Sequence, residues 1–313
     1  MASRPDLSVV TVSHNSRDLL RACLLSLGSS SAVIEVLVVD SGSIDGTAEL
    51  VGREFPSVRL LATAQNLGFT RGNNRALRIA RGRHLLLLNP DTVVEPGALD
   101  AMLGFLEARP DVGVVGPQLR SPDGIVQPSR HRFPGRLTAF VDGTVLERWF
   151  GRSRLLDAFY ARDRGDDELQ DVDWLRGACL MVRREAAASA GLFDERFFMY
   201  SEEVDLCRRI RAAGWRVVYL PSAVVVHHEG RSSEQNLAAR DIHFHDSRVR
   251  YYQKHFGRPL AIALRLAVAA HFLFLAAEEA GKLLLGHRPE LRRQRLRNLG
   301  RVIAHQARRL VAA

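Results

Sequence analysis

The chain has few cysteines and lacks the segments that carry a protein into or through a membrane. Its 313 residues include three cysteines, Cys23, Cys179 and Cys207, in apolar contexts and without a CxxC pair. An odd, scattered set argues against a disulfide framework, so we interpret them as reduced core thiols of a cytosolic protein. The N-terminus shows no signal-peptide pattern. No run approaches the ~20 apolar residues of a membrane span, so we expect no transmembrane helix.

Two glycine-rich loops that hold nucleotide phosphates are also missing. A dinucleotide-binding dehydrogenase needs GxGxxG after its first strand, and here that turn is SHNS. No GxxxxGK[ST] loop occurs either. The phosphates of a bound nucleotide would therefore need another counter-charge. A divalent cation, Mg or Mn, held by Asp91 can supply it, since such ions typically take one or two carboxylates plus phosphate oxygens.

Acidic residues are scarce at the C-terminal end. The formal net charge is +9, and residues 286–313 hold eight arginines against one glutamate, a surplus of seven. The rest of the chain is close to neutral. This distribution predicts a basic attachment surface rather than a nucleic-acid cleft, so we expect no nucleic-acid partner.

The chain does contain a regular alternation of strand and helix patterns. Hydrophobic residues make up 46% of it, enough for one large domain or one domain with an appendage. Such alternation predicts an α/β fold with a mostly parallel, doubly wound sheet flanked by helices. The expected early strands are residues 7–12, 35–39, 58–61 and 84–88, and the helices include residues 47–55 and 71–80.

The second half is less regular. Residues 128–171 are polar and rich in Arg and Asp, and we expect an irregular, variable loop region there. Gly177 interrupts an expected strand, which indicates a bulge or a close approach of a ligand to the backbone. The further expected elements are strands at residues 112–116, 174–182, 215–220 and 223–226 and a helix at 202–213.

From about residue 246 the pattern is helical. On a helical wheel of residues 260–286, the polar side chains fall within roughly 140° and leave a broad apolar face. With the arginines that follow, this favours a helix lying on an anionic membrane surface. Packing against its own domain or a dimer partner explains the same pattern, so a homo-oligomer stays open.

Acidic residues follow two of the apolar segments. The apolar run LLLL at 85–88 ends in Asn89, Pro90 and Asp91, and ligands of open α/β sheets bind at such strand ends. In FDERFFMYSEEVDLC at 193–207, Glu202 and Glu203 start the expected helix. Acids at a helix start also have a structural explanation, because the helix dipole favours them, and Asp91 could equally be a turn residue or a cap.

Seven motifs in order resemble the inverting GT-A glycosyltransferases of family 2, in particular their rhamnosyltransferase-like and galactofuranosyltransferase-like branch. The motifs are VVTVSHNS, VVDSGSIDGT, NLGFTRGNNRAL, LLLNPDT, WLRGACLMVRRE, FDERFFMYSEEVDLCRRIRAAGW and HHEGRSS. The resemblance implies a GT-A catalytic domain over residues 1–245. Its nucleotide-sugar half would be about 1–120 and its acceptor half about 121–245, followed by a helical, basic extension over 246–313.

The resemblance also implies a donor site. Asp40 would accept a hydrogen bond from the base, beside the backbone of Val12 and the ring of His14. The full set of donor-binding residues that it implies is Val12, His14, Asp40, Asn66, Gly68, Arg71, Asn73, Asn89 and Asp91.

Metal binding and catalysis follow from the same resemblance. Asp91 corresponds to the metal-binding acid of a DxD-type motif, here NPD, and His227 would add a metal or diphosphate contact. An acceptor hydroxyl must lose its proton as it attacks, so a carboxylate base is required. The family's Glu-Asp pair is Glu202-Glu203 here, which makes Glu203 the expected base. Glu202 and Asp205 remain alternatives.

Trp174, Gly177 and Glu202 would line the acceptor side. The expected reaction moves a sugar with inversion from a nucleoside-diphosphate sugar, dTDP-rhamnose first and a UDP-sugar next, to a cell-surface or lipid-linked glycan. The expected location is cytoplasmic and peripheral on the inner face of the cell membrane. A nucleotidyltransferase and a catalytically decayed sugar-binding protein are the alternatives.

Overall fold

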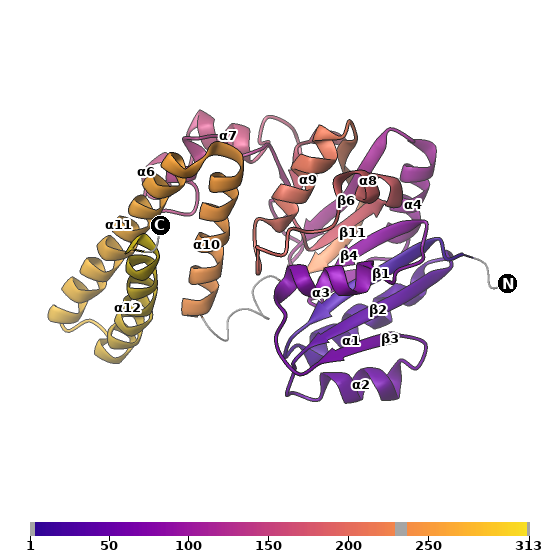
Figure 1. The fold of residues 1–313 in the computed structure, drawn as a ribbon, viewed down its shortest axis with the longest axis horizontal. Helices are drawn as coiled ribbons and strands as arrows, with labels where there is room; N and C mark the ends of the chain where they lie inside the picture. Colours follow the sequence, from indigo (N-terminus) through magenta and orange to yellow (C-terminus); the bar gives the residue numbers. More distant parts are fainter. Residues whose placement is uncertain (1–3, 229–236, 312–313) are drawn as a thin grey trace. The chain divides into compact units, whose positions relative to one another are not determined.

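The computed structural model describes residues 4–228 and 237–311, and the chain forms two compact units (Figure 1). The α/β unit comprises Met1–Phe133 and Tyr160–Ser232, and the helical unit comprises Pro134–Phe159 and Ser233–Ala313. The helical unit thus takes in residues 134–159, which the sequence placed with the acceptor half.

One large sheet organises the α/β unit. Its strand order is β3-β2-β1-β4-β10-β6-β11-β5, and β8 pairs with β11. A second, two-stranded sheet joins β7 to β9. The strands are β1 (Leu7–Ser13), β2 (Ile34–Ser41), β3 (Arg59–Thr63), β4 (His84–Leu88), β5 (Thr92–Val94), β6 (Val112–Arg120), β7 (Arg130–His131), β8 (Gln170–Val172), β9 (Trp174–Leu175), β10 (Cys179–Arg183) and β11 (Arg216–His227).

The α/β fold expected from the sequence is confirmed, with parallel pairing in two blocks. Strands β3, β2, β1 and β4 are parallel, and so are β6 and β11. Between the blocks, β10 runs antiparallel to both β4 and β6. The sheet is therefore mixed rather than mostly parallel.

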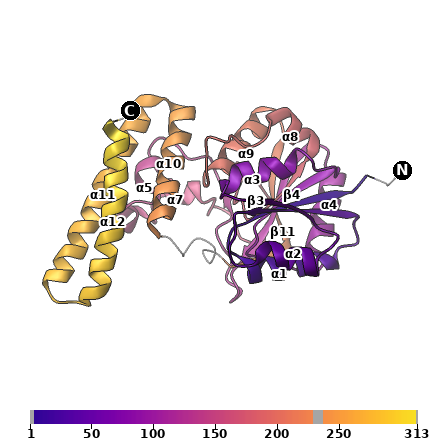
Figure 2. The same cartoon turned by 60° about the horizontal axis from the view of Figure 1, so that its bottom comes forward.

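Helices cover both faces of this sheet (Figure 2). Buried residues of α1 (Arg17–Ser26), α2 (Thr47–Glu54) and α4 (Ala98–Ala108) share one apolar cluster with the sheet. The helices α3 (Gly68–Leu77), α8 (Arg184–Ala190) and α9 (Glu202–Ala212) lie on the opposite face. With both faces covered, all five residues of β4 are buried, which accounts for its continuous apolar run.

The strand directions bring several chain segments to one edge of the sheet. Because β10 is antiparallel to both β4 and β6, those two strands point the same way, and β11 is parallel to β6. The carboxyl ends of β1, β2, β4 and β11 therefore share an edge. The turn before β10 lies there too, since the Asn89 N–H donates to the Ala178 carbonyl at 2.9 Å.

Three expectations about the second half are wrong in detail. Residues 174–182 form two strands, because the chain turns at residues 176–178 and β9 pairs with β7 instead of the large sheet. The two strands expected at 215–226 are one, β11, with a register shift between Leu220 and Val224. Residues 128–171 are not an irregular loop, since they contain β7, β8 and three short helices, α5 (Thr138–Val141), α6 (Glu147–Phe150) and α7 (Arg154–Phe159).

The helical unit joins these three short helices to α10 (Leu237–Phe256), α11 (Arg258–Leu284) and α12 (Pro289–Val311). Buried polar contacts hold the two parts together. The Arg248 guanidinium donates to the Ala139 carbonyl at 2.6 Å, and the Tyr252 hydroxyl donates to the Gly135 carbonyl at 3.0 Å. A buried charged side chain needs hydrogen-bond partners in defined directions, so the Arg248 contact fixes the position of α5 against α10.

Helix α11 differs from the expectation that no segment could span a membrane. By length and composition alone it is apolar enough to do so, with a mean hydropathy of 2.1 over an 18-residue window that is 22% buried. The sequence expectation counted unbroken apolar runs, and Arg265 and His271 interrupt this one.

The three cysteines agree with expectation, being free and buried, and burial raises the pKa of the Cys23 thiol to about 12.

Candidate active site

Asp91 and His227 meet at the shared edge of the sheet. Asp91 lies between the end of β4 and the start of β5, and β5 pairs with the end of β11 so that Thr92 faces His227. The His228 N–H donates to the Asp91 carbonyl at 2.8 Å. These backbone contacts bring His227 Nε2 within 3.5 Å of Asp91 Oδ1, with both residues buried.

Gln127 determines which nitrogen of His227 carries the proton. The Gln127 amide nitrogen lies 2.9 Å from the His227 carbonyl oxygen, which can only accept, so that nitrogen donates. The Gln127 amide oxygen must then accept from His227 Nδ1, at 2.9 Å. With Nδ1 bonded to Gln127, Nε2 is the ring nitrogen that faces Asp91. No sequence pattern pointed to Gln127, because its partner His227 lies 100 residues further along the chain.

This arrangement fits a divalent cation. Nε2 and Asp91 Oδ1 face each other, so the two can act together as ligands of one ion, and a proton on Nε2 would instead join them as an ion pair. Neighbouring ligands of one octahedral ion at about 2.1 Å are roughly 3 Å apart, close to the observed spacing. Nearby, Asn89 Oδ1 is buried without a hydrogen-bond partner.

Within residues 4–228 and 237–311, no cluster of three or more His, Cys, Asp or Glu side chains could hold a metal ion. Asp91 and His227 offer two ligands, and an ion held by them would take its other ligands from phosphate oxygens or water, as Mg²⁺ commonly does.

The ends of β1 and β2 form the next part of the edge. Asp40 is buried, and its Oδ1 accepts the Ser43 N–H at 3.3 Å. His14 Nδ1 lies 2.8 Å from the Ser41 carbonyl, which ties the end of β1 to the end of β2. The side chain of Val12 packs closely against α3, because a Cβ on Gly72 would lie only 2.8 Å from it.

The motif at residues 66–77 forms the loop before α3 and the whole of that helix, and several of its polar groups make local bonds. Asn66 Oδ1 accepts from the Ser41 hydroxyl at 3.2 Å and from the Gly68 N–H at 2.9 Å. Asn73 is buried and donates to the Phe69 carbonyl. The Arg71 side chain is exposed. Asn66 and Asn73 thus stabilise this loop and helix through local hydrogen bonds, and Arg71 lies at the surface.

Gly68 joins this motif to the acidic segment. It has a φ of +75°, and a Cβ there would lie 2.6 Å from the Phe198 ring, so only glycine fits. The Phe69 N–H donates to the Phe198 carbonyl at 2.8 Å. Two motifs that are distant in sequence therefore form one wall.

The acid pair is positioned by a strained turn. Tyr200 and Ser201 have φ values of 70° and 62°, in the left-handed region that non-glycine residues rarely adopt. Helix α9 starts directly afterwards at Glu202. A Cβ at Gly177 would lie 3.6 Å from the side chain of Glu203, so this glutamate lies against the turn before β10.

The two glutamates have different environments. Burial raises the pKa of Glu202 well above its usual value, and the charge of Glu203 raises it further. Burial also raises the pKa of Glu203, while backbone N–H groups and the Arg176 charge oppose the shift. The opposing contributions act on Glu203 more than on Glu202, so of the two carboxyl groups Glu203 is the one whose charged form its surroundings favour. Arg176, which sequence reasoning missed, supports that charge from the turn beside Gly177.

The neighbouring acids have other bonds. Asp205 is fully buried and pairs with Arg209 at 2.9 Å, so it does not compete for the role of base. Asp194 pairs with Arg196 at 2.6 Å. In contrast, Oε2 of both Glu202 and Glu203 is buried without a hydrogen-bond partner in the described structure. An unsatisfied buried carboxyl oxygen is costly, which makes the pair a candidate binding or reacting group.

Trp174 does not present an open ring face. Its ring stacks on His131 with centroids 4.1 Å apart, its Nε1 donates to the Arg132 carbonyl, and it is 9% exposed. The ring therefore packs within the protein, and the carbohydrate-facing role expected from the sequence gains no support from its surroundings.

A mixed α/β sheet with carboxylates and a histidine gathered at its carboxyl edge is an arrangement suited to an enzyme active site, and sequence comparison identifies the class of enzyme. The profile of the family described as Glycosyl transferase family 2 matches residues 8–188. The chain belongs to this family and is a glycosyltransferase. This match sets aside the nucleotidyltransferase alternative.

Individual relatives indicate the branch of the family to which the chain is similar. The chain is 35% identical over 285 residues to the N-acetylglucosaminyl-diphospho-decaprenol L-rhamnosyltransferase of Mycobacterium tuberculosis, covering 85% of this chain and 92% of that protein. It is 23% identical to the rhamnosyltransferase WbbL of Escherichia coli, over 72% of this chain and 85% of that one. We therefore describe the protein as a rhamnosyltransferase-like member of family 2.

Among solved structures, the mannosyltransferase of Pyrobaculum calidifontis in complex with GDP-Man and Mn²⁺ is similar in fold. The match has a TM-score of 0.55 at 20% sequence identity and covers 99% of this chain and 88% of that one. At this identity the similarity supports the GT-A type of fold.

Proposed function

We propose that this glycosyltransferase moves a sugar with inversion from a nucleoside-diphosphate sugar to a hydroxyl of a lipid-linked or cell-surface glycan. The observation that carries the proposal is that the Asp91–His227 pair and the Glu202–Glu203 pair both lie beside the turn of residues 176–178 and Asn89. One pair suits a diphosphate with its cation, and the other suits an acceptor hydroxyl. The donor proposed first is dTDP-rhamnose, in line with the two rhamnosyltransferase relatives, and a UDP-sugar is next.

The donor would lie across the ends of β1, β2 and β4. Asp40 would accept from the pyrimidine base beside His14 and Val12, and Gly68 and Asn89 would lie along the sugar phosphates. Asp91 and His227 would hold the divalent cation, Mg or Mn, which offsets the charge that develops on the departing diphosphate. Gln127 would keep the lone pair of His227 Nε2 directed at this position.

The reaction would be a single displacement. Glu203 takes the proton of the acceptor hydroxyl while the hydroxyl oxygen attacks the anomeric carbon. The bond from that carbon to the diphosphate breaks on the opposite side, and the configuration inverts. Glu202 keeps its proton and so leaves Glu203 as the charged partner. Gly177 leaves room for the acceptor beside the base, and Arg176 opposes the rise in its pKa.

Donor identity can be tested by binding. The intact protein is mixed with dTDP-rhamnose, UDP-sugars or GDP-sugars, each with and without Mn²⁺, and its thermal unfolding is recorded. We expect the largest stabilisation with dTDP-rhamnose and Mn²⁺, because a ligand that binds only the folded state raises the unfolding temperature. If no nucleotide-sugar shifts the transition, the donor site is incorrectly assigned.

The helical unit would attach the enzyme to the inner face of the cell membrane from the cytoplasm. Two observations support this proposal. Helix α11 exposes large apolar side chains, among them Leu266 at 55% and Leu273 at 56%, and the arginines of α12 follow it. An apolar face next to basic residues is typical of helices at anionic membranes. Attachment there would bring the enzyme to a lipid-linked acceptor.

A further inference from the structure

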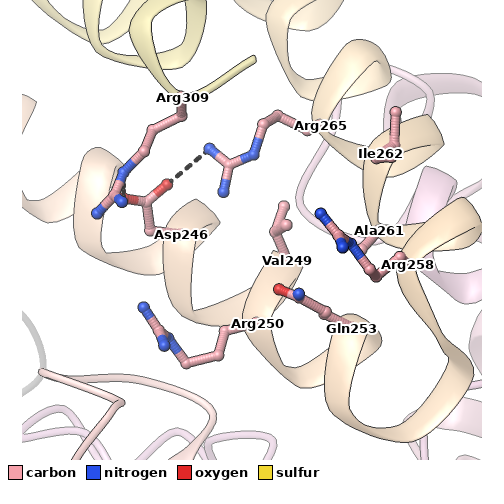
Figure 3. Close-up of a pocket in the computed structure, with 9 residues that line it drawn as sticks. All are labelled: Asp246, Val249, Arg250, Gln253, Arg258, Ala261, Ile262, Arg265 and Arg309. Atoms are coloured by element: carbon pink, nitrogen blue, oxygen red, sulfur yellow. Dashed lines mark hydrogen bonds and ion pairs between the residues drawn. The ribbon is translucent and has the colours of Figure 1, made fainter. Parts of the chain in front are cut away.

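The helical unit contains a cavity of about 220 Å³ that the proposed reaction does not use. It lies among α10, the first turns of α11 and the last turn of α12 (Figure 3). Its lining combines charged and apolar side chains from all three helices: Asp246, Val249, Arg250, Gln253, Arg258, Ala261, Ile262, Arg265 and Arg309.

The lining carries a surplus of positive charge, with four arginines against a single acid. That acid, Asp246, holds the wall in place. It accepts from Arg265 at 3.0 Å and from His305 at 2.7 Å, and it lies 3.6 Å from Arg309. Figure 3 shows Arg265 and Arg309 beside it. One carboxylate thus contacts three basic side chains.

The cavity combines this wall with an apolar floor. Val249 and Ala261 are each 4% exposed and close it from below. Helix α11 begins at Arg258, and the positive end of a helix dipole favours an anion there. The volume is below the roughly 300–1,000 Å³ of sites for drug-sized ligands, so it suits a small anionic group.

A long apolar surface starts at the mouth of the cavity. Ile262 lines the cavity and is 41% exposed. The same side of α11 carries only exposed apolar residues and one glycine: Ile262, Ala263, Leu266, Ala270, Leu273, Phe274, Ala277, Gly281 and Leu284. At 1.5 Å per residue this face is roughly 33 Å long. An anion site that opens onto such a face matches a molecule with an acidic head and a hydrocarbon tail.

We propose that this cavity binds the phosphate head group of an anionic membrane phospholipid, with the hydrocarbon chain along the exposed face of α11. The inference deepens the membrane attachment proposed above and rests on it. A guanidinium group can donate two parallel hydrogen bonds to two oxygens of one phosphate. Such contacts define a specific site, whereas a diffuse basic surface gives only general attraction.

The test compares two double substitutions that remove equal charge from the full-length protein. Arg250→Gln with Arg258→Gln changes the cavity, and Arg297→Gln with Arg301→Gln changes exposed residues of α12 outside it. Binding is measured by flotation with vesicles of phosphatidylcholine alone or mixed with phosphatidylglycerol. Circular dichroism checks folding, and transfer to a soluble acceptor analogue checks the catalytic unit.

We expect the wild type to bind only the phosphatidylglycerol vesicles and the cavity variant to bind them roughly 30-fold less, since it loses two direct guanidinium–phosphate contacts, each worth about a factor of five. The α12 variant should lose only a few-fold. Equal losses in the two variants would overturn the cavity and leave membrane attachment standing. Absence of wild-type binding would overturn both, while transfer to the soluble acceptor would still report on the proposed chemistry.

A second pair of variants tests the same proposal if the first cavity variant does not fold. Ile262→Glu places a negative charge at the mouth of the cavity, and Ile44→Glu makes the same change at a residue that is 92% exposed in the α/β unit. We expect binding to phosphatidylglycerol vesicles to fall about tenfold or more for Ile262→Glu only. Unchanged binding of a folded Ile262→Glu variant would contradict the proposal.

Discussion

The strand β4 and the helix α11 are both strongly apolar, yet only the strand is hidden within its own unit. All five residues of β4 are buried, because β1 and β10 pair with its edges and helices cover both faces of the sheet. In α11 only the side that contains Leu264 and Val268 is buried, and Leu266 and Leu273 face outward. An apolar sequence thus predicts that a surface will leave water, but not what will cover it.

Charged groups show the same contrast between the two units. The α/β unit buries Asp40, Asp91 and Glu202 at one edge of its sheet, whereas α12 keeps most of its arginines exposed. Burying a charge is expensive unless a partner compensates for it. The buried acids are therefore the residues proposed for the reaction, and the exposed arginines are those proposed for attachment.

The largest expected effect comes from the acid pair. Glu203→Gln should lower the turnover number about 10²- to 10⁴-fold, because it removes the base and keeps the shape. Glu202→Gln should stay close to wild type, since Glu202 holds its proton and an amide resembles a neutral carboxyl group. Transfer rates at saturating donor, with nucleotide binding as the control, measure both. Similar losses in the two variants would show that the pair acts differently.

The comparison of β4 with α11 can be tested directly by truncating one leucine in each. Leu86→Ala, at 0% exposure, should destabilise the α/β unit by about 2–5 kcal/mol because it leaves a cavity. Leu266→Ala, at 55% exposure, should change stability by less than about 0.5 kcal/mol. Urea unfolding followed by fluorescence in single-tryptophan backgrounds, which keep either Trp174 in the α/β unit or Trp149 in the helical unit, separates the two units. A large cost at Leu266 would mean that this face of α11 is already covered in solution.

Gln127→Leu tests the buried polar edge of the sheet. Without the amide oxygen, His227 is no longer held in the tautomer that presents Nε2, and the affinity for Mn²⁺ should fall about 10- to 100-fold. Gln118→Leu, at another buried glutamine of the same unit, is the matched control. Titration with Mn²⁺ in the presence of nucleotide measures the effect. Equal affinity in both variants would remove His227 from the cation site.

The smallest effect concerns stability and pH. The folded-state pKa of Glu202 is raised above 4.5, so the folded protein binds the extra proton. This contribution to stability is complete below that value and is lost as pH rises through the raised pKa. Glu202→Gln has no such loss, so it should gain on the wild type with rising pH, by about 1 kcal/mol. Unfolding curves over a pH series measure this, and a parallel pH dependence would contradict it.

Local patterns in the sequence predicted most elements of the α/β unit because each element there follows from its own residues. The run at 84–88 became β4, and the acids of residues 202–203 begin α9 as expected. The helices within residues 128–171 were missed because their contacts come from far away in sequence, through Arg248 and Tyr252. Gln127 could not be predicted for the same reason, since its partner is His227.

The sequence by itself determined the family, the α/β fold and the acids that end its apolar segments, because periodicity and motif order are local properties of the chain. Only the tertiary structure decided which acids share an edge, which of them stay unpaired and which face of α11 remains exposed. Asp205 and Glu203 are two residues apart, yet one is paired with Arg209 while the other has a buried oxygen without a partner. That distinction depends on what packs around each side chain, which spacing along a chain does not specify.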